Sequence, residues 1–402
     1  MKKTLIAFAA LSAIAGMAQA QSTVTIYGLL DANIGSYKTN IVSAGPTIQN
    51  VRQSKIESGG LNASRWGIRV SEDLGGGLAA VGNLESGFDI STGASQQGGL
   101  LFGRRANVGV TSNSFGTVTL GRNSSSYDDV ATDHAMMGGS VFDPAYSNSS
   151  NSTTAAANIF SSANLPGFLG TRPGGVTPQV TWLGYQTRFN NSVKYISPNF
   201  SGFSGSAMYA LGEDKTTDVG VIPGNNASKS VSANLKYANG PLLVSGGYQS
   251  ETVVGSVGTG FAGSKPALEN ALLNVAYDFG VAKVGAGFNR AKYKDVIVPA
   301  GLPGANGTAT FAAQKEYSLS VAVPLGATTL SAGYARSKGD TLGKSTGFGV
   351  QALYSLSKRT TLYVGGASTK AYDTLANAVL LASPASTIGR TTTYAAGVRH
   401  TF

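Results

Sequence analysis

Residues 229–251 read KSVSANLKYANGPLLVSGGYQSE, and this short segment carries the pattern from which the architecture follows. Apolar Val231 and Leu235 alternate with polar Ser232 and Lys236, and the alternation resumes beyond the turn residues at 239–241. Successive side chains of a strand point to opposite faces. Period two therefore predicts two strands, each apolar on one face and polar on the other, joined by a tight turn.

The same period recurs along the chain. Seven tight turns rich in Gly, Asn, Pro and Ser need fourteen strands, and the first and last strands raise the predicted number to sixteen. The predicted turns lie at 71–77, 111–116, 197–202, 238–240, 278–280, 324–327 and 356–359. The predicted strands span 23–35, 61–72, 77–90, 101–112, 115–122, 182–196, 202–212, 228–238, 241–251, 268–278, 280–293, 314–324, 327–338, 344–356, 359–371 and 391–402.

Both ends of the chain point to export and a membrane. Lys2, Lys3 and an apolar stretch before Ala18-Gln19-Ala20 predict a signal peptide over residues 1–20, whose removal takes the formal charge from +10 to +8. No later segment has the roughly 18 consecutive apolar residues that a spanning helix needs. A sheet in lipid must close, because an open edge leaves backbone groups unpaired. The prediction is one all-β domain over 21–402, a transmembrane sixteen-stranded antiparallel barrel wide enough for an aqueous channel.

Composition favours a barrel over other classes. The chain has 54 glycines, 12% charged residues and 42% hydrophobic residues, which fits neither a helical globular protein nor a disordered chain. A soluble β-sandwich also alternates, yet Tyr and Phe edge the apolar faces here, and short and long connections alternate, as in membrane barrels. With no cysteine, stability cannot come from disulfides.

Six short motifs resemble one family. They are VTIYG at 24–28, SRWG at 64–67 followed by EDLGGGL at 72–78, LESGF at 84–88, FGTVTLGR at 115–122 and GVRHTF at 397–402. Together they resemble the Gram-negative trimeric porins of the β-proteobacterial branch. The resemblance implies a homotrimer in the cell outer membrane that passes small hydrophilic solutes and ions by passive diffusion. It also implies an inward-folded third external loop, at 123–181, and a terminal Phe402 that is read by the barrel-assembly machinery.

Alternation selects the charges that face the lumen. Trp66, Ile68 and Val70 take the lipid side, so Arg65 and Arg69 point inward, and Arg188 and Lys194 are lumenal by the same argument. By resemblance, Arg65, Arg104 and Arg188 match the basic cluster of the family. Alternation favours Arg105 over Arg104 unless a bulge occurs near Gly103, so both remain candidates. For Arg122 and Arg399, near the rims, ordinary surface charge is an equal alternative.

Acidic candidates are fewer. Glu85 is inward by parity, and Asp133 and Asp143 lie in the long loop. A cluster of permanent cations facing few acids predicts mild anion selectivity, weakened by salt. The alternative is an anion-specific pore that binds phosphate or carboxylates, because arginines are suited to that task as well.

Other functions find little support in the sequence. Of two histidines, His400 is expected on the lipid side, and His134, in the long loop, is expected to be solvated rather than catalytic. We therefore expect no enzyme activity, no metal site and no cofactor, although Asp128-Asp129 is a candidate for loosely bound Ca²⁺. The basic residues are scattered, which argues against nucleic-acid binding. External Lys and Arg are candidates for contact with lipopolysaccharide phosphates.

Overall fold

The computed structural model describes residues 22–42, 48–145, 182, 185–212, 229–252, 267–294, 296–297, 308–309, 313–339, 343–370 and 387–402. The predicted signal peptide and residues 146–181 of the long loop lie outside these ranges. No helix in the described residues is long and apolar enough to cross a membrane.

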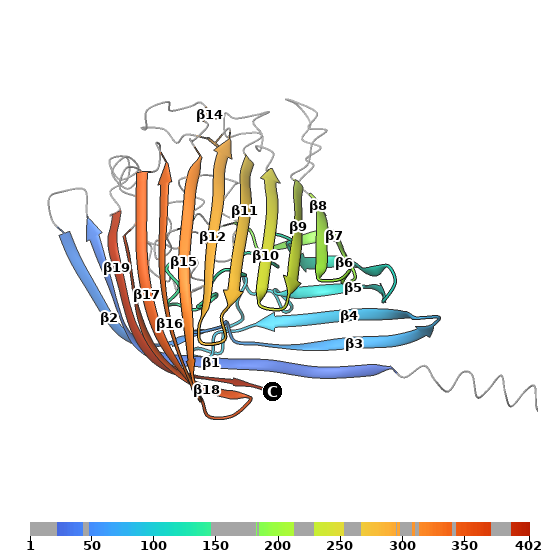
Figure 1. Ribbon diagram of the computed structural model, residues 1–402, viewed down its shortest axis with the longest axis horizontal. Helices are drawn as coiled ribbons and strands as arrows, with labels where there is room; N and C mark the ends of the chain where they lie inside the picture. Colours follow the sequence, from blue (N-terminus) through green and yellow to red (C-terminus); the bar gives the residue numbers. More distant parts are fainter. Residues whose placement is uncertain are drawn as a thin grey trace, which may run out of the picture.

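The described elements are all β-strands (Figure 1). The N-terminal half contains β1 (Thr23–Val42), β2 (Ile48–Ser58), β3 (Arg65–Gly75), β4 (Leu78–Gly87), β5 (Arg105–Ser112), β6 (Gly116–Ser124), β7 (Arg188–Ile196), β8 (Phe203–Leu211) and β9 (Lys229–Asn239). The rest contains β10 (Leu242–Thr252), β11 (Ala267–Asp278), β12 (Lys283–Lys294), β13 (Val296–Ile297), β14 (Thr308–Ala309), β15 (Gln314–Leu325), β16 (Thr328–Gly339), β17 (Gly343–Ser355), β18 (Thr360–Lys370) and β19 (Thr387–Thr401).

Strand β1 closes the sheet into a barrel. On one edge it pairs with β19, from Leu29 opposite Thr401 to Val42 opposite Thr387. On its other edge, residues 23–29 pair with β3 and residues 32–42 pair with β2. The sheet has 17 strands, and because β2 and β3 share one position beside β1, sixteen positions complete the antiparallel ring. The predicted sixteen-stranded barrel is confirmed.

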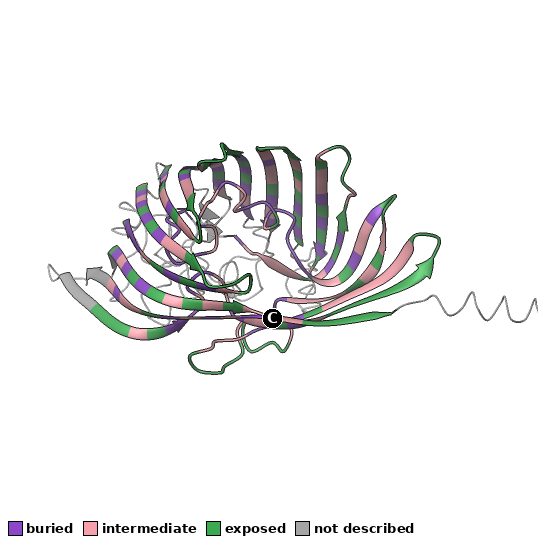
Figure 2. Cartoon of the chain, turned by 60° about the horizontal axis from the view of Figure 1, so that its bottom comes forward, coloured by how far each residue is buried: buried purple, intermediate pink, exposed green. Residues whose placement is uncertain are grey.

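The wall is apolar outside and polar inside, as period two predicts. Leu235 and Leu273 on the outer face are 61% and 53% exposed, whereas Ser232 and Asn274 on the inner face are fully buried. Figure 2 shows the resulting bands of buried and exposed residues along the strands. Aromatic residues gather near strand ends, for example Phe203 and Tyr237, whose rings lie 4.6 Å apart. This distribution suits a wall with hydrocarbon on its outer side.

All seven tight turns occur where they were predicted, and they gather at one end of the barrel. Figure 1 shows several of these hairpins at the lower ends of β9 to β18. In Gly-rich turns such as 75–77, each glycine has a positive φ, which a side chain would strain. Short turns mark the periplasmic side of such barrels, so the opposite rim is the external one.

Several predicted boundaries were wrong. The first strand continues to Val42, β2 was not predicted at all, and the second predicted strand starts at Arg65 rather than residue 61. The strands predicted at 101–112 and 182–196 begin at Arg105 and Arg188. Where a strand starts later than predicted, side chains from distant parts of the chain contact the residues before it: Asp31 binds residues 60–62, Arg122 Nε donates to Gly103 O, and Glu251 accepts from Gln186 N–H.

The break between β2 and β3 is held by Asp31 of β1. Its fully buried carboxylate accepts hydrogen bonds from the backbone N–H groups of Gly60 (3.1 Å), Leu61 (2.8 Å) and Asn62 (2.8 Å). The hydroxyl of Tyr363 on β18 donates to the same carboxylate. An acceptor with two oxygens thus satisfies three backbone donors that the interrupted ladder leaves without strand partners, together with the Tyr363 hydroxyl. Residues 59–64 therefore fold into the barrel instead of continuing the strand.

The first prediction concerns this carboxylate. Asp31→Asn supplies one amide oxygen in place of two carboxylate oxygens, so at least one buried donor loses its acceptor. The amide N–H₂ group also points at donors instead of acceptors. We expect the free energy of unfolding to fall by about 3 kcal/mol, measured in detergent from the chemical unfolding midpoint of the β-sheet circular dichroism. The matched control is Asp278→Asn in an exposed turn, where the carboxylate accepts from Gly280 N–H (2.9 Å). Equal midpoints for both variants would contradict this role of Asp31.

Candidate functional site

The chain that follows β6 turns into the barrel and lies against its inner wall. Ser126 N–H donates to Ser232 Oγ on β9 (2.9 Å), and Asn274 on β11 donates to Val130 O (2.7 Å). Farther along the segment, Met136 N–H donates to Ser320 Oγ on β15 (3.0 Å). Residues 125–145, which we call the inner segment, thus cross several strands, bonded to side chains that alternation directs inward.

The wall beneath the inner segment is lined by glycine. A Cβ on Gly285 would lie 2.0 Å from His134 O, and one on Gly349 would lie 1.8 Å from Phe142 O. Both contacts are with backbone, which cannot move aside as a side chain can. The inward glycines that contact the segment are Gly247, Gly285, Gly287, Gly333, Gly349 and Gly365. Because these positions carry no side chain, the segment approaches the wall as closely as two backbones allow.

The tip of the inner segment is fastened to the break in the wall. Val141 N–H donates to Gly60 O (2.9 Å). Leu61 packs with Met137, Val141 and Phe142 of the segment in one buried cluster, to which Tyr363 and Ala367 of β18 also belong. Because the carboxylate of Asp31 holds residues 60–62 in place, it also positions the part of the wall that the tip of the inner segment contacts.

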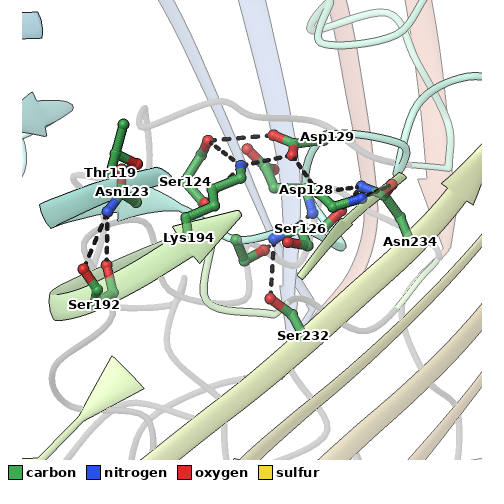
Figure 3. A network of polar contacts seen from close by, with 12 residues as sticks. Thr119, Asn123, Ser124, Ser126, Asp128, Asp129, Ser192, Lys194, Ser232 and Asn234 are labelled. Carbon is green, nitrogen blue, oxygen red and sulfur yellow. Dashed lines mark hydrogen bonds and ion pairs between the residues drawn. The ribbon is translucent and has the colours of Figure 1, made fainter. Parts of the chain in front are cut away.

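A network of polar contacts holds the start of the segment (Figure 3). Lys194 Nζ on β7 lies 2.6 Å from Asp129 Oδ2 and donates to Ser124 O (3.0 Å), and its side chain is only 5% exposed. Ser206 Oγ donates to the same Asp129 oxygen (3.1 Å). Lys194, predicted as a pore cation, is thus placed on the inner wall with its charge neutralised by the segment.

The loop acids also make contacts within the protein. Asp133 pairs with Lys236 of β9 (3.0 Å). Asp143 is buried and accepts from the backbone N–H of Ala145 (2.9 Å). Tyr185 O–H donates to Asp128 (2.8 Å), where burial raises the pKa of the carboxyl group and the nearby Arg188 partly offsets this rise. Among the described residues, no group of three or more His, Cys, Asp or Glu is placed to hold a metal ion; Ca²⁺ at Asp128-Asp129 stays a prediction.

A basic cluster occupies the neighbouring wall. Arg104 Nε lies 2.6 Å from Glu85 Oε1, and both side chains are buried. Tyr27 O–H donates to the other Glu85 oxygen (2.8 Å), and the Arg69 guanidinium lies 4.1 Å from the centre of the Tyr27 ring. Arg65 is close enough to interact electrostatically with Arg104 and Glu85. The structure thus brings together Glu85 and three of the predicted arginines.

The ambiguity between Arg104 and Arg105 is resolved by the start of β5. Arg105 opposes Glu85 in the ladder and is an inward strand residue. Arg104 precedes the strand, where alternation does not apply, and turns toward Glu85 as well. A bulge does occur at another place, between Ser192 and Phe189 of β7, where Asn191 has φ 49°.

A hollow of about 670 Å³ lies between the basic cluster and the start of the inner segment. The charged residues that line it are Arg69, Arg105, Lys194, Lys236 and Asp129, accompanied by Asn83, Asn107, Thr119, Asn123 and Asn234. Lys194 and Lys236 have acidic partners. Within the described part of the chain, neither Arg69 nor Arg105 has a carboxylate at ion-pair distance, so the hollow retains positive charge.

Three charged or polar residues of the site were not among the predicted pore residues: Tyr27, which donates to Glu85, and Asp129 and Lys236, which line the hollow. The inward parity of Tyr27 and Lys236 was visible in the sequence, but without a spatial partner it did not distinguish them from other lumenal positions. Asp129 was noted as an acid of the long loop and as a calcium candidate but not as the partner of Lys194, because no local pattern shows that the two residues lie side by side.

His134 is buried, so the expectation of a solvated side chain was wrong. The residue is 1% exposed, and its ring stacks on Trp182, with centroids 5.1 Å apart. Gly285 and Gly287 of β12 leave the space that the residue occupies. Burial lowers the pKa of His134 to about 4, although nearby Asn274 favours the charged ring. The imidazole of His134 is therefore neutral when the inner segment lies against the wall. His400, as expected, is on the outer face, where it contacts Thr360 (2.9 Å).

The second prediction concerns the glycine-lined wall. Gly285→Ala places a methyl group where the backbone of His134 lies, so the inner segment must move off the wall. We expect amide hydrogen exchange of residues 125–145 to accelerate by about 30-fold, equivalent to a loss of about 2 kcal/mol. The control is Gly82→Ala on β4, where the nearest atom to the added Cβ is 3.7 Å away. Unchanged exchange in the Gly285 variant would show that the segment does not need the contact.

The third prediction concerns acid pH. Because the pKa of seated His134 is about 4 and its ordinary value is 6.5, proton uptake favours the displaced segment. The free energy that favours the wall-bound inner segment over the displaced one is therefore largest above pH 6.5. It declines as pH falls toward 4, and the total loss is about 3 kcal/mol. In a Trp66→Phe background, fluorescence of Trp182 should change over that interval.

The control for this experiment is His134→Phe, which keeps the ring stacking and removes the titration. We expect its fluorescence to stay constant between pH 6.5 and 4. The same change in both proteins would show that the effect does not come from His134.

Known proteins share this architecture. The family profile for Gram-negative porins matches residues 7–374. An outer membrane porin of Bordetella pertussis is 31% identical over the full length of both chains, and outer membrane porin protein 32 of Delftia acidovorans is 32% identical over 73% of this chain and 71% of its own. The solved anion-selective porin from Comamonas acidovorans superposes with a TM-score of 0.69 at 24% identity, covering 95% of this chain and 100% of that one. The chain therefore belongs to the Gram-negative porin family, the channel-forming β-barrels of the outer membrane.

Proposed function

We propose that this porin is a general diffusion channel with a mild preference for anions. The observation that carries the proposal is the hollow beside β3 and β5, where Arg69 and Arg105 face the lumen without an acidic partner among the described residues. The inner segment narrows the lumen at that level. Small hydrophilic solutes and inorganic anions pass between this segment and the basic wall.

The preference follows from electrostatics. An arginine stays charged at any physiological pH. Low-dielectric walls focus the field of such charges into the aqueous lumen and raise the local concentration of anions. The effect stays mild because Glu85, Asp129 and Asp133 neutralise Arg104, Lys194 and Lys236. The anion selectivity of the Comamonas acidovorans porin, which shares this fold, supports the assignment by similarity.

The partners of the channel belong to the same proposal. Three copies of the chain assemble into a trimer, as in the trimer form of OmpT from Vibrio cholerae, which shares this fold. The barrel-assembly machinery recognises the last strand through Phe402, whose backbone pairs with Gly28 of β1 (3.1 Å). External cations contact lipopolysaccharide. The channel is proposed to use no cofactor and to catalyse no reaction.

The fourth prediction tests ion preference. Arg69→Gln/Arg105→Gln should lower the ratio of anion to cation permeability at least twofold in 0.1 M KCl, because two focused charges are lost. The ratio is obtained from the reversal potential across a planar bilayer under a KCl gradient. At 1 M salt the difference between variant and wild type should shrink, since the Debye length falls from about 10 Å to about 3 Å.

The control is Arg290→Gln/Arg336→Gln, which removes two charges from the outer face. Its permeability ratio should equal that of the wild type. A wild-type channel that prefers cations would refute the proposal. Saturable block of conductance by sub-millimolar phosphate or a carboxylate would favour the anion-specific alternative.

A further inference from the structure

A row of cations crosses the outer face of four neighbouring strands. Arg290 of β12 lies directly opposite Lys315 of β15, which lies opposite Lys338 of β16, which lies opposite Lys344 of β17. All four side chains are exposed. They share strand parity with Tyr317, Tyr334 and Phe348, whose large exposed side chains mark the outer face. We call these four residues the outer row, and Figure 1 shows its strands side by side.

Further cations flank the outer row on the same face. Lys370 of β18 lies opposite Arg390 of β19, both at the external ends of their strands. Glu269 of β11 is outward as well, but it faces Lys292 and forms an ion pair with Lys294. In the ranges that the structure describes, Lys315 and Lys338 have no carboxylate at ion-pair distance. The positive charge of the outer row is therefore not balanced at its centre.

Such a row is unfavourable unless something bridges it. Directly opposite side chains on neighbouring strands have Cβ atoms about 5 Å apart, and like charges at such positions repel. The repulsion grows where lipid lowers the dielectric constant. Anions held between successive ammonium groups would convert this repulsion into attraction. The register thus indicates a ligand with more than one negative group.

The position of the outer row relative to the membrane identifies the ligand class. The row lies near the rim opposite the tight turns, which is the external rim. Its residues stand just beyond an aromatic belt that includes Phe288 and Tyr317, whose rings are 5.2 Å apart. Aromatic belts lie at the membrane interface, so the outer row is at the level of the lipid headgroups of the outer leaflet.

We propose that the outer row binds the phosphate groups of the phosphorylated glycolipid in the outer leaflet. Each ammonium group supplies three donors, and the guanidinium of Arg290 supplies a fork that matches two phosphate oxygens. A second copy of this chain related by a twofold axis fits poorly on this face, because it would bring another row of cations. This inference rests on the lipid contact in the proposed function and gives it a location.

The fifth prediction tests this site with two variants of equal charge. Lys315→Gln/Lys338→Gln removes the centre of the outer row, and Lys358→Gln/Arg359→Gln removes two exposed cations from a turn at the periplasmic rim. Binding of diphosphoryl lipid A to each purified protein is measured by titration in detergent followed by native mass spectrometry. We expect at least tenfold weaker binding for the row variant and less than a twofold change for the control.

Further arms of the same experiment separate the explanations. Monophosphoryl lipid A should bind the wild type more weakly than the diphosphoryl form. Equal binding of diphosphoryl lipid A by the row variant and the wild type would overturn the proposal. The proposal would also be overturned if the control variant lost as much lipid A binding as the row variant. The same holds if the row variant lost binding of phosphatidylglycerol to the same extent as binding of lipid A.

Conductance of the same variants distinguishes this inference from the proposed function. We expect the row variant to lose lipid binding while its conductance and ion preference stay unchanged. A folded wild-type barrel that binds lipid A through the row but conducts no ions would refute the channel proposal and leave the lipid site standing.

Discussion

The structure depends on the requirement that every backbone group in hydrocarbon has a hydrogen-bond partner inside the protein. Strand β1 meets it by pairing with β19 on one edge and with β3 and then β2 on the other. Where the ladder is interrupted, at residues 59–64, the carboxylate of Asp31 takes over the role of strand partner. A break in the wall is therefore tolerated only where a buried acceptor replaces the missing bonds.

Closure creates an interior that must then be filled in part. The inner segment does so by lying on inward glycines such as Gly285 and Gly349, with its tip on the wall break at Gly60. Its acids Asp129 and Asp133 reach the wall cations Lys194 and Lys236. The segment thus has two effects, since it narrows the lumen and also decides which lumenal cations stay unbalanced.

The parts that sequence predicted are those with local causes. Alternation and turn chemistry placed the strands and all seven tight turns, because both depend on residues a few positions apart. The wall break was missed, since its cause is Asp31, about thirty residues earlier, together with Tyr363. His134 was misjudged for the same reason, because Gly285 and Gly287, far along the chain, make the space that buries it. The inward cations were selected by parity, whereas their acidic partners depend on how the inner segment folds.

The alternation of side chains along each strand also explains why the chain has cations both in the aqueous lumen and on its outer face. The formal charge is +10, and a change of one position along a strand moves a cation from the aqueous lumen to the lipid side. Lys236 faces inward and meets Asp133, whereas Lys315 faces outward near the external rim with no carboxylate of the described chain at ion-pair distance. A cation near the middle of the lipid face would cost about 2–4 kcal/mol, but the cost falls close to zero near the interface. Outward cations are therefore tolerated at the level of the headgroups, where the anions that balance them belong to the membrane rather than to the protein.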